Sequence, residues 1–208
     1  MKIPLLASLF LFFWVLCRQM KRHTRSIQEE QQSFWQKERA SNNVRKKPLD
    51  DLNYITIPLE KLPFESHAED ETILDCASTI KILSECKIVN LTGITNTDLK
   101  LTYGTANITV LTEYDQNFTL LVTTLQKWAE QLYALSDSAG AVTLLEYAVS
   151  IGSDVSKAYS LLASIYDENN ELSKITFLKE CAAKLTSSSG KIIVRKLEEA
   201  YPLTEKFK

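Results

Sequence analysis

Apolar residues recur at matching positions when the second half of the chain is compared with itself at an offset of 34 residues. Every pair is apolar: Leu125 and Tyr159, Trp128 and Leu162, Ala129 and Ala163, Leu132 and Tyr166, Ala141 and Ile175, Leu144 and Leu178, and Ala148 and Ala182. Their spacings of three and four residues indicate helices. The two alanine pairs indicate close crossings, because only a small side chain fits between backbones that approach closely. The period therefore predicts stacked helical hairpins.

The second copy carries the pattern most fully, as Tyr159-x2-Leu162-Ala163-x2-Tyr166 followed by Leu172, Ile175, Leu178 and Ala182. At these residues the chain resembles the tetratricopeptide repeat family, whose unit is 34 residues of helix, turn and helix. The resemblance covers roughly residues 122–187, with copies at about 122–153 and 156–187. It implies a mainly α fold built as a helical-hairpin array. The sequence departs from the family pattern at Asn170, which replaces the usual turn glycine, at Ile175, which replaces a usual alanine, and at Ser153 and Ser187, which replace the closing proline.

Two copies are fewer than the three or more that such arrays usually need, so flanking helices must complete the stack. Ser66 with Glu69 forms a capping-box pattern before a predicted helix at about 67–87. A capping helix is predicted at about 190–201, starting near Gly190. Residues 88–104 are interpreted as a loop with a short helix capped by Thr97. The helical repeat-like domain is expected to span residues 66–208.

The N-terminus contains an uncharged run of fifteen residues from Ile3 to Cys17. As a helix it measures roughly 22 Å, somewhat less than the ~30 Å hydrocarbon core, and flanking Lys2 and Arg18 can snorkel to cover part of the difference. The run ends in bulky residues where a signal peptidase needs small ones. We therefore expect residues 1–18 to form an uncleaved single-pass transmembrane anchor.

Orientation follows from the basic residues that flank this run. Four of them come after it, namely Arg18, Lys21, Arg22 and Arg25. Because basic flanks tend to stay cytoplasmic, the C-terminal domain is predicted to be cytoplasmic at the cell membrane. Four widely spaced cysteines agree with a reducing compartment. Three sequons, at Asn90, Asn107 and Asn117, point the other way, since they could accept glycans in a lumen.

Two segments connect the anchor to the repeats. Residues 19–47 are rich in Gln, Glu, Lys and Arg and are predicted to form a basic, polar helical stalk. Residues 48–65 contain prolines at 48, 58 and 63 and form an extended linker. Its large apolar residues indicate that 54–64 lies in a groove of the following domain; the alternative is a loose tether.

Three linker and loop sequences also resemble those of membrane-anchored proteins of clostridial-type bacteria: YITIPLEKLPF, NLTGITNTDLKLTYGTANI and EYDQNF. That group has no established activity, so the resemblance implies a bacterial membrane location and no chemistry.

No residue pattern indicates catalysis. The chain has no phosphate loop, dinucleotide glycine pattern, GxSxG elbow or HExxH, and its two histidines, His23 and His67, form no plausible dyad or metal pair. We expect no enzyme activity, no cofactor and no metal. A net charge of −2 gives no reason to expect nucleic-acid binding.

What remains is a surface for binding. Hairpin arrays hold a peptide or partner helix in a groove lined by the first helix of each repeat. The positions between the packing residues are expected to be exposed there: Thr124, Gln126, Lys127 and Gln131 in the first copy, and Ser160, Ser164 and Asp167 in the second. The function predicted is a membrane-anchored adaptor or scaffold for an unknown protein or peptide. The alternatives are an extracytoplasmic envelope protein of opposite topology and an enzyme without a recognisable motif. The groove could also be filled by the chain's own residues 54–64.

Overall fold

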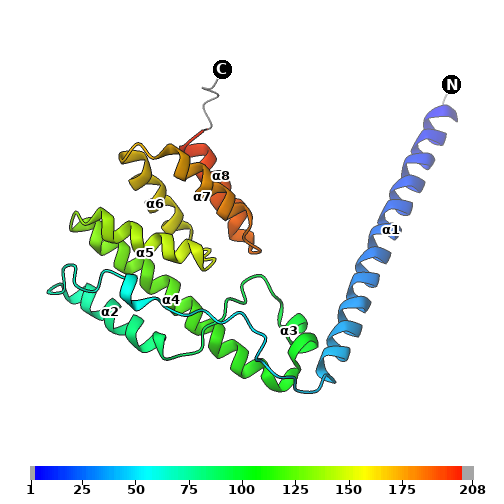
Figure 1. Ribbon diagram of the computed structural model, residues 1–208. Coiled ribbons are helices and arrows are strands. Elements are labelled where there is room, and N and C mark those ends of the chain that lie inside the picture. The colour runs from blue at the N-terminus through cyan, green and yellow to red at the C-terminus, as the bar shows by residue number, and fades with distance from the viewer. Residues whose placement is uncertain (1–2, 203–208) are drawn as a thin grey trace. The chain divides into compact units, whose positions relative to one another are not determined.

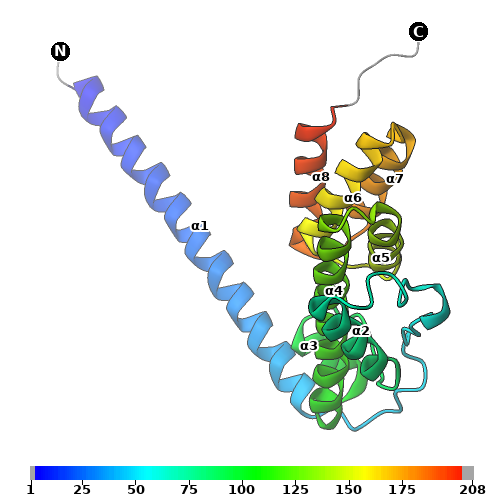
Figure 2. The ribbon, with the colours of Figure 1, turned by 90° about the vertical axis from the view of Figure 1, so that its left-hand side faces the viewer.

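The computed structural model of the chain describes residues 3–202, including the side chains of residues 12–14, 16–24 and 28–202. This part is mainly helical, as the sequence predicted, and contains no strand beyond one isolated bridge between Tyr54 and Val89. The chain divides into two compact units, Met1–Pro48 with Thr95–Ile108 and Leu49–Ile94 with Thr109–Lys208. Figures 1 and 2 show the ribbon from two directions.

The first unit joins the end of α1 (Ile3–Asn42) to α3 (Asn96–Tyr103) and the short 3-10 helix η2 (Thr105–Asn107). Lys37 pairs with Asp98 at 2.6 Å, and Glu38 accepts a hydrogen bond from Thr97 at 2.6 Å and pairs with Lys100. The loop and short helix predicted for residues 88–104 are confirmed. Thr97 was the wrong cap, however, because the hydroxyl of Thr95 accepts the first helical N–H, from Asp98. Segment 95–108, predicted within the 66–208 domain, thus packs with the end of α1.

Helix α1 covers both the predicted anchor and most of the predicted stalk. No helix in the described part of the chain is long and apolar enough to cross a membrane. Most side chains of the predicted span, residues 3–17, lie outside the described residues.

The second unit is built from the remaining helices: η1 (Leu59–Lys61), α2 (Glu71–Ser84), most of α4 (Ile108–Ala134), α5 (Ser138–Ser150), α6 (Ser156–Glu168), α7 (Leu172–Ala183) and α8 (Ser188–Ala200). Helix α6 packs against α5, α7 and α8, and α7 packs against α8. Within this unit α4, α6 and α8 form one layer, and α5 and α7 form the other (Figure 2).

The predicted start of α2 needs a correction. The helix was expected from about residue 67 behind a Ser66 capping box, but it begins at Glu71 and is capped by Asp70, whose carboxylate accepts a hydrogen bond from the Ile73 N–H at 3.0 Å. Ser66 instead donates to the carboxylate of Asp137. An aspartate at the cap is as favourable as a serine, and the chain uses the one nearer the apolar run.

The two hairpin turns have the same structure at the same 34-residue offset. Ser136 and Asn170 both have a positive φ, of 66° and 60°. The Asp137 N–H donates to Leu132 O at 2.9 Å, and the Glu171 N–H donates to Tyr166 O at 2.7 Å. These are the bonds of a Schellman motif, which satisfies the last carbonyls of a helix. Asn170 therefore takes the left-handed conformation that the usual turn glycine would supply.

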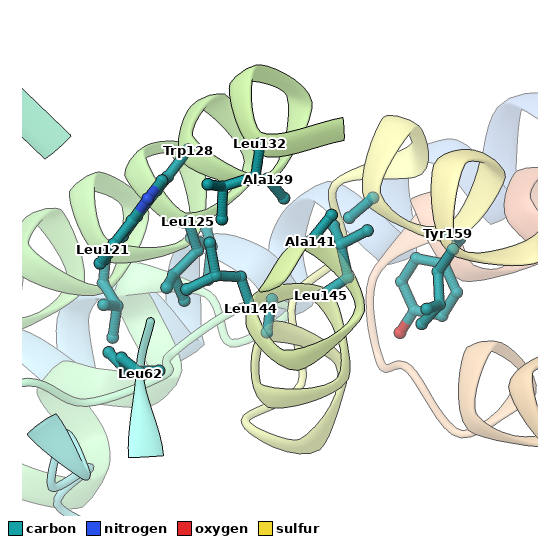
Figure 3. Close-up of a cluster of buried hydrophobic side chains, with 14 of the residues drawn as sticks. Leu62, Leu121, Leu125, Trp128, Ala129, Leu132, Ala141, Leu144, Leu145 and Tyr159 are labelled. Atoms are coloured by element: carbon teal, nitrogen blue, oxygen red, sulfur yellow. The ribbon is translucent and has the colours of Figure 1, made fainter. Parts of the chain in front are cut away.

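The residues of all seven offset pairs are buried. Figure 3 shows part of this core, where Leu125, Ala129 and Leu132 of α4 face Ala141 and Leu144 of α5. Trp128 and Leu121 are likewise 0% exposed. The predicted apolar periodicity is thus the periodicity of the core.

Residues 49–66 run along the helices as an extended strap that completes this core. Ile57 and Leu62 are buried, and the ring of Phe64 lies 5.2 Å from that of Trp128, between centroids. The Ile55 N–H donates to Ile88 O at 2.9 Å, and the Tyr147 hydroxyl donates to Thr56 O at 3.3 Å. The strap is therefore an integral part of the fold and not a loose tether.

Truncating a strap residue tests this point. Leu62→Ala should lower the free energy of unfolding by about 2–3 kcal/mol, because it removes buried apolar atoms and leaves a cavity. Ile82→Ala is the matched control, since Ile82 is 68% exposed, and it should change stability by less than about 0.5 kcal/mol. Urea unfolding followed by circular dichroism measures both. Equal effects of the two substitutions would show that the strap does not belong to the core.

Candidate functional site

Helices α4, α6 and α8 border a hollow of about 370 Å³. Two of the predicted groove residues, Ser160 and Ser164, line it. The complete lining is Glu130 from α4, Ser156, Lys157, Ser160, Leu161 and Ser164 from α6, and Lys196 from α8. The three helices that contribute the lining, α4, α6 and α8, form one layer (Figure 2).

The hollow exists because α6 presents serines there at intervals of four residues. Ser156, Ser160 and Ser164 lie on one face of the helix, and their short side chains leave the space open. Ser160 donates to Ser156 O at 3.1 Å and Ser164 donates to Leu161 O at 2.8 Å. These hydroxyl oxygens keep lone pairs that can accept hydrogen bonds from a ligand.

Charged groups of both signs border the serines. The Glu130 carboxylate accepts a hydrogen bond from the Gln126 amide at 2.9 Å. On the other two helices Lys157 and Lys196 carry positive charge, and Lys196 Nζ lies 3.2 Å from the Ser156 hydroxyl. The hollow can therefore bind a polar, extended chain through hydrogen bonds and charge pairs.

The predicted groove positions of the first copy are placed differently. Thr124 is 8% exposed and Gln126 is 6% exposed, so the expectation that they face solvent is wrong. Lys127 pairs with Asp75 at 2.9 Å, and the Gln131 amide donates to the Asp70 carboxylate at 2.9 Å. Asp75 lies on α2 and Asp70 caps the start of that helix, which the 34-residue pattern does not contain. Lys127 is exposed, as predicted, although it pairs with a carboxylate, and Gln131 is half-buried.

The remaining predicted residues lie outside the hollow. Asp167 is exposed near the end of α6 and does not line the space. Arg18, Lys21 and Arg22 are exposed on α1, and the side chain of Arg25 lies outside the described residues.

The strap does not fill the hollow. Residues 54–64 bury their apolar side chains in the core cluster, and none of them lines the space beside Ser160. The possibility that the chain's own linker occupies the groove is therefore not borne out at this position.

Five lining residues were not predicted from the sequence: Glu130, Ser156, Lys157, Leu161 and Lys196. A signal for two of them was present. Glu130 stands 34 residues before Ser164, and Ser156 continues the four-residue spacing of Ser160 and Ser164. Lys196 has no such signal, because only the packing of α8 on α6 brings it to the serines.

All three sequon asparagines use their side-chain N–H groups inside the fold. Asn90 donates to Ile151 O and Gly152 O, each at 3.2 Å. Asn107, which is 0% exposed, donates to Lys47 O and Tyr103 O, each at 2.7 Å, and Asn117 donates to Lys87 O at 3.0 Å. The atom that would carry a glycan is thus engaged at each site, and at Asn107 a glycan would not fit this structure.

Searches for similar proteins add no second source of evidence. No protein-family model, curated protein or solved structure matches the chain. Among the described side chains, no three His, Cys, Asp or Glu residues are grouped as metal ligands would be.

Two helix caps next to the predicted groove residues give the stability a pH dependence. Hydrogen bonding to the Ile73 N–H and the Gln131 amide lowers the pKa of Asp70 from its usual 3.8. A hydrogen bond from Ser66, assisted by the Gly140 N–H, lowers that of Asp137, again from a usual pKa of 3.8. A carboxylate whose pKa is lowered in the folded state stabilises the fold at pH values above its usual pKa. This stability is lost as the pH falls through the lowered pKa.

The variant Asp70→Asn/Asp137→Asn should therefore lose less stability than the wild type between about pH 5 and pH 2. Asparagine still caps a helix but does not titrate. Urea midpoints measured at several pH values in this range give the comparison. Parallel pH profiles would show that these caps do not titrate as the structure indicates.

Proposed function

We propose that the protein is a non-enzymatic adaptor or scaffold, anchored in the cell membrane by its N-terminal segment, that binds a protein or peptide partner through the hollow on α4, α6 and α8. Its action is localisation: tethering raises the effective concentration of a partner near the bilayer without any reaction.

The single observation that carries this proposal is the serine-lined hollow. It lies on the first helices of successive hairpins, includes two residues predicted from the repeat pattern, and is left open by the strap. Side chains that accept hydrogen bonds, bordered by Glu130, Lys157 and Lys196, suit a peptide better than a compact apolar molecule.

The repeat architecture proposed is tetratricopeptide-like. The buried alanines Ala129 and Ala163, and the equivalent turns at Ser136 and Asn170, support it. Helices α2 and α8 would complete the stack on either side of the two copies, as arrays of this kind require.

The orientation proposed is cytoplasmic for the C-terminal domain. The excess of basic residues after the apolar run supports it. The hydrogen bonds of the three sequon asparagines also support it, because they engage the atoms that would carry glycans in the opposite orientation.

Filling the hollow tests the binding role. In Ser160→Arg/Ser164→Arg two long side chains occupy the space, so any partner captured by the full-length wild-type chain from the cells that express it should be lost or bound at least about tenfold more weakly. Quantitative mass spectrometry of the captured proteins gives the ratio. Ser78→Arg, at an exposed serine on α2, is the matched control and should retain the partner. A partner retained equally by all three chains would place binding elsewhere.

A native cysteine can report the topology. Cys86 is exposed and Cys76 is buried, and burial also raises the pKa of the Cys76 thiol, which makes it unreactive. With Cys17 and Cys181 changed to serine, Cys86 should react with a membrane-impermeant maleimide only after cell lysis. The protein must sediment with membranes in the same preparation. Labelling in intact cells would establish the extracytoplasmic alternative.

A further inference from the structure

A second hollow, which the sequence did not predict, lies on the other layer of the array. It has a volume of about 390 Å³ and is formed by α5, α6 and α7. Its walls include apolar side chains from all three helices: Val149, Leu162, Leu178 and Cys181. The volume falls within the range of about 300–1,000 Å³ typical of ligand pockets, so the hollow has room for an aromatic ring.

An aromatic side chain stands open to water at the edge of this hollow. Phe177 lines the hollow and yet is 62% exposed. A large apolar group beside an apolar space marks an interaction surface, because its exposure to water costs free energy that burial would recover.

The rim of the hollow carries one acid and one base. Glu146 accepts a hydrogen bond from the Tyr166 hydroxyl at 2.7 Å, which fixes its carboxylate at the rim. Lys174 lies 3.9 Å from the Glu146 carboxylate, 3.0 Å from that of Glu171 and 5.0 Å from the Tyr166 ring centre. The side chains of Glu146 and Lys174 are 48% and 46% exposed, so each can reach another molecule.

We propose that this face binds a second copy of the same chain about a two-fold axis. Phe177 of each copy enters the hollow of the other, and Lys174 of each copy pairs with Glu146 of the other. A two-fold interface pairs the same patch on both copies. The patch must therefore carry both the inserted side chain and the hollow that receives it, and both an acidic and a basic group. The hollow with Phe177, Glu146 and Lys174 meets each of these requirements. A strongly charged peptide would meet repulsion at one of the two rim charges.

This dimer would leave the serine-lined hollow free, because the two hollows share no lining residue. The inference does not rest on the binding role proposed above. It predicts that the protein presents its partner-binding face twice.

The first test uses the full-length chain, purified in a mild detergent, over a dilution series in the micromolar range. Light scattering that separates protein mass from detergent mass should give a dimer for the wild type. In Phe177→Asp the dissociation constant should rise at least about thirtyfold, as for the loss of an aromatic hot spot. Ile82→Asp, which changes a similarly exposed residue on α2, is the matched control and should leave the constant unchanged.

A wild-type chain that is monomeric throughout would overturn the proposal. The same holds for a dimer that survives Phe177→Asp, or one that Ile82→Asp weakens to the same degree. Circular dichroism of each variant shows whether the fold is retained.

A second test does not depend on Phe177. Glu146→Lys alone places two lysines on each rim, and Lys174→Glu alone places two glutamates there, so each variant should be monomeric by itself. Mixing the two folded variants should restore a dimer that contains one copy of each, because both cross-copy pairs then have opposite charges. A mixture that stays monomeric would refute the paired charges, and dimers of either variant alone would refute the interface.

Discussion

The second unit depends on the burial of one helix, α4, on several of its faces. Its residues Leu121, Leu125, Trp128 and Leu132 are all 0% exposed, and they meet the strap and α5 (Figure 3). Each fully buried side chain of this kind is worth about 1.5–3 kcal/mol, so four of them outweigh most single polar contacts in the unit. The indole N–H of Trp128 has no hydrogen-bond partner among the described residues. Its position is therefore set by shape and apolar contact, including the contact with the Phe64 ring.

The buried half of the fold could be predicted because a repeat offset records which residues face inward. Each residue of the seven offset pairs is in the core, and the alanines at 129 and 163 stand where helices cross closely. This information is local: a helix with a period of 3.6 residues has one inward face, and the same face recurs in each copy. The short helix of residues 96–103 was also predictable from its turn formers, although its capping residue was not.

The exposed half could not be predicted in the same way, because exposure depends on elements outside the repeat. Thr124 and Gln126 satisfy the pattern for surface residues, yet they are 8% and 6% exposed. Lys127 and Gln131 contact the carboxylates of Asp75 and Asp70, which lie more than fifty residues earlier in the chain. Ser160 and Ser164 border an open hollow, because no side chain within residues 28–202 fills the space beside α6 there. The Phe177 hollow had no sequence signal at all, since three helices must pack before the space exists.

The equivalence of the two turns has a consequence for how the array could change in length. Ser136 and Asn170 end their helices with the same pair of hydrogen bonds, and α5 meets α6 through a contact that lies between two copies of one unit. A third copy inserted after Ser153 would, however, move Thr186 away from Ile151 and Gly152. The loop at residues 90–92 would oppose this, because Asn90 donates to Ile151 O and Gly152 O while the Thr186 hydroxyl donates to Thr92 O. This loop therefore ties the end of one hairpin to the end of the next and fixes the distance between them.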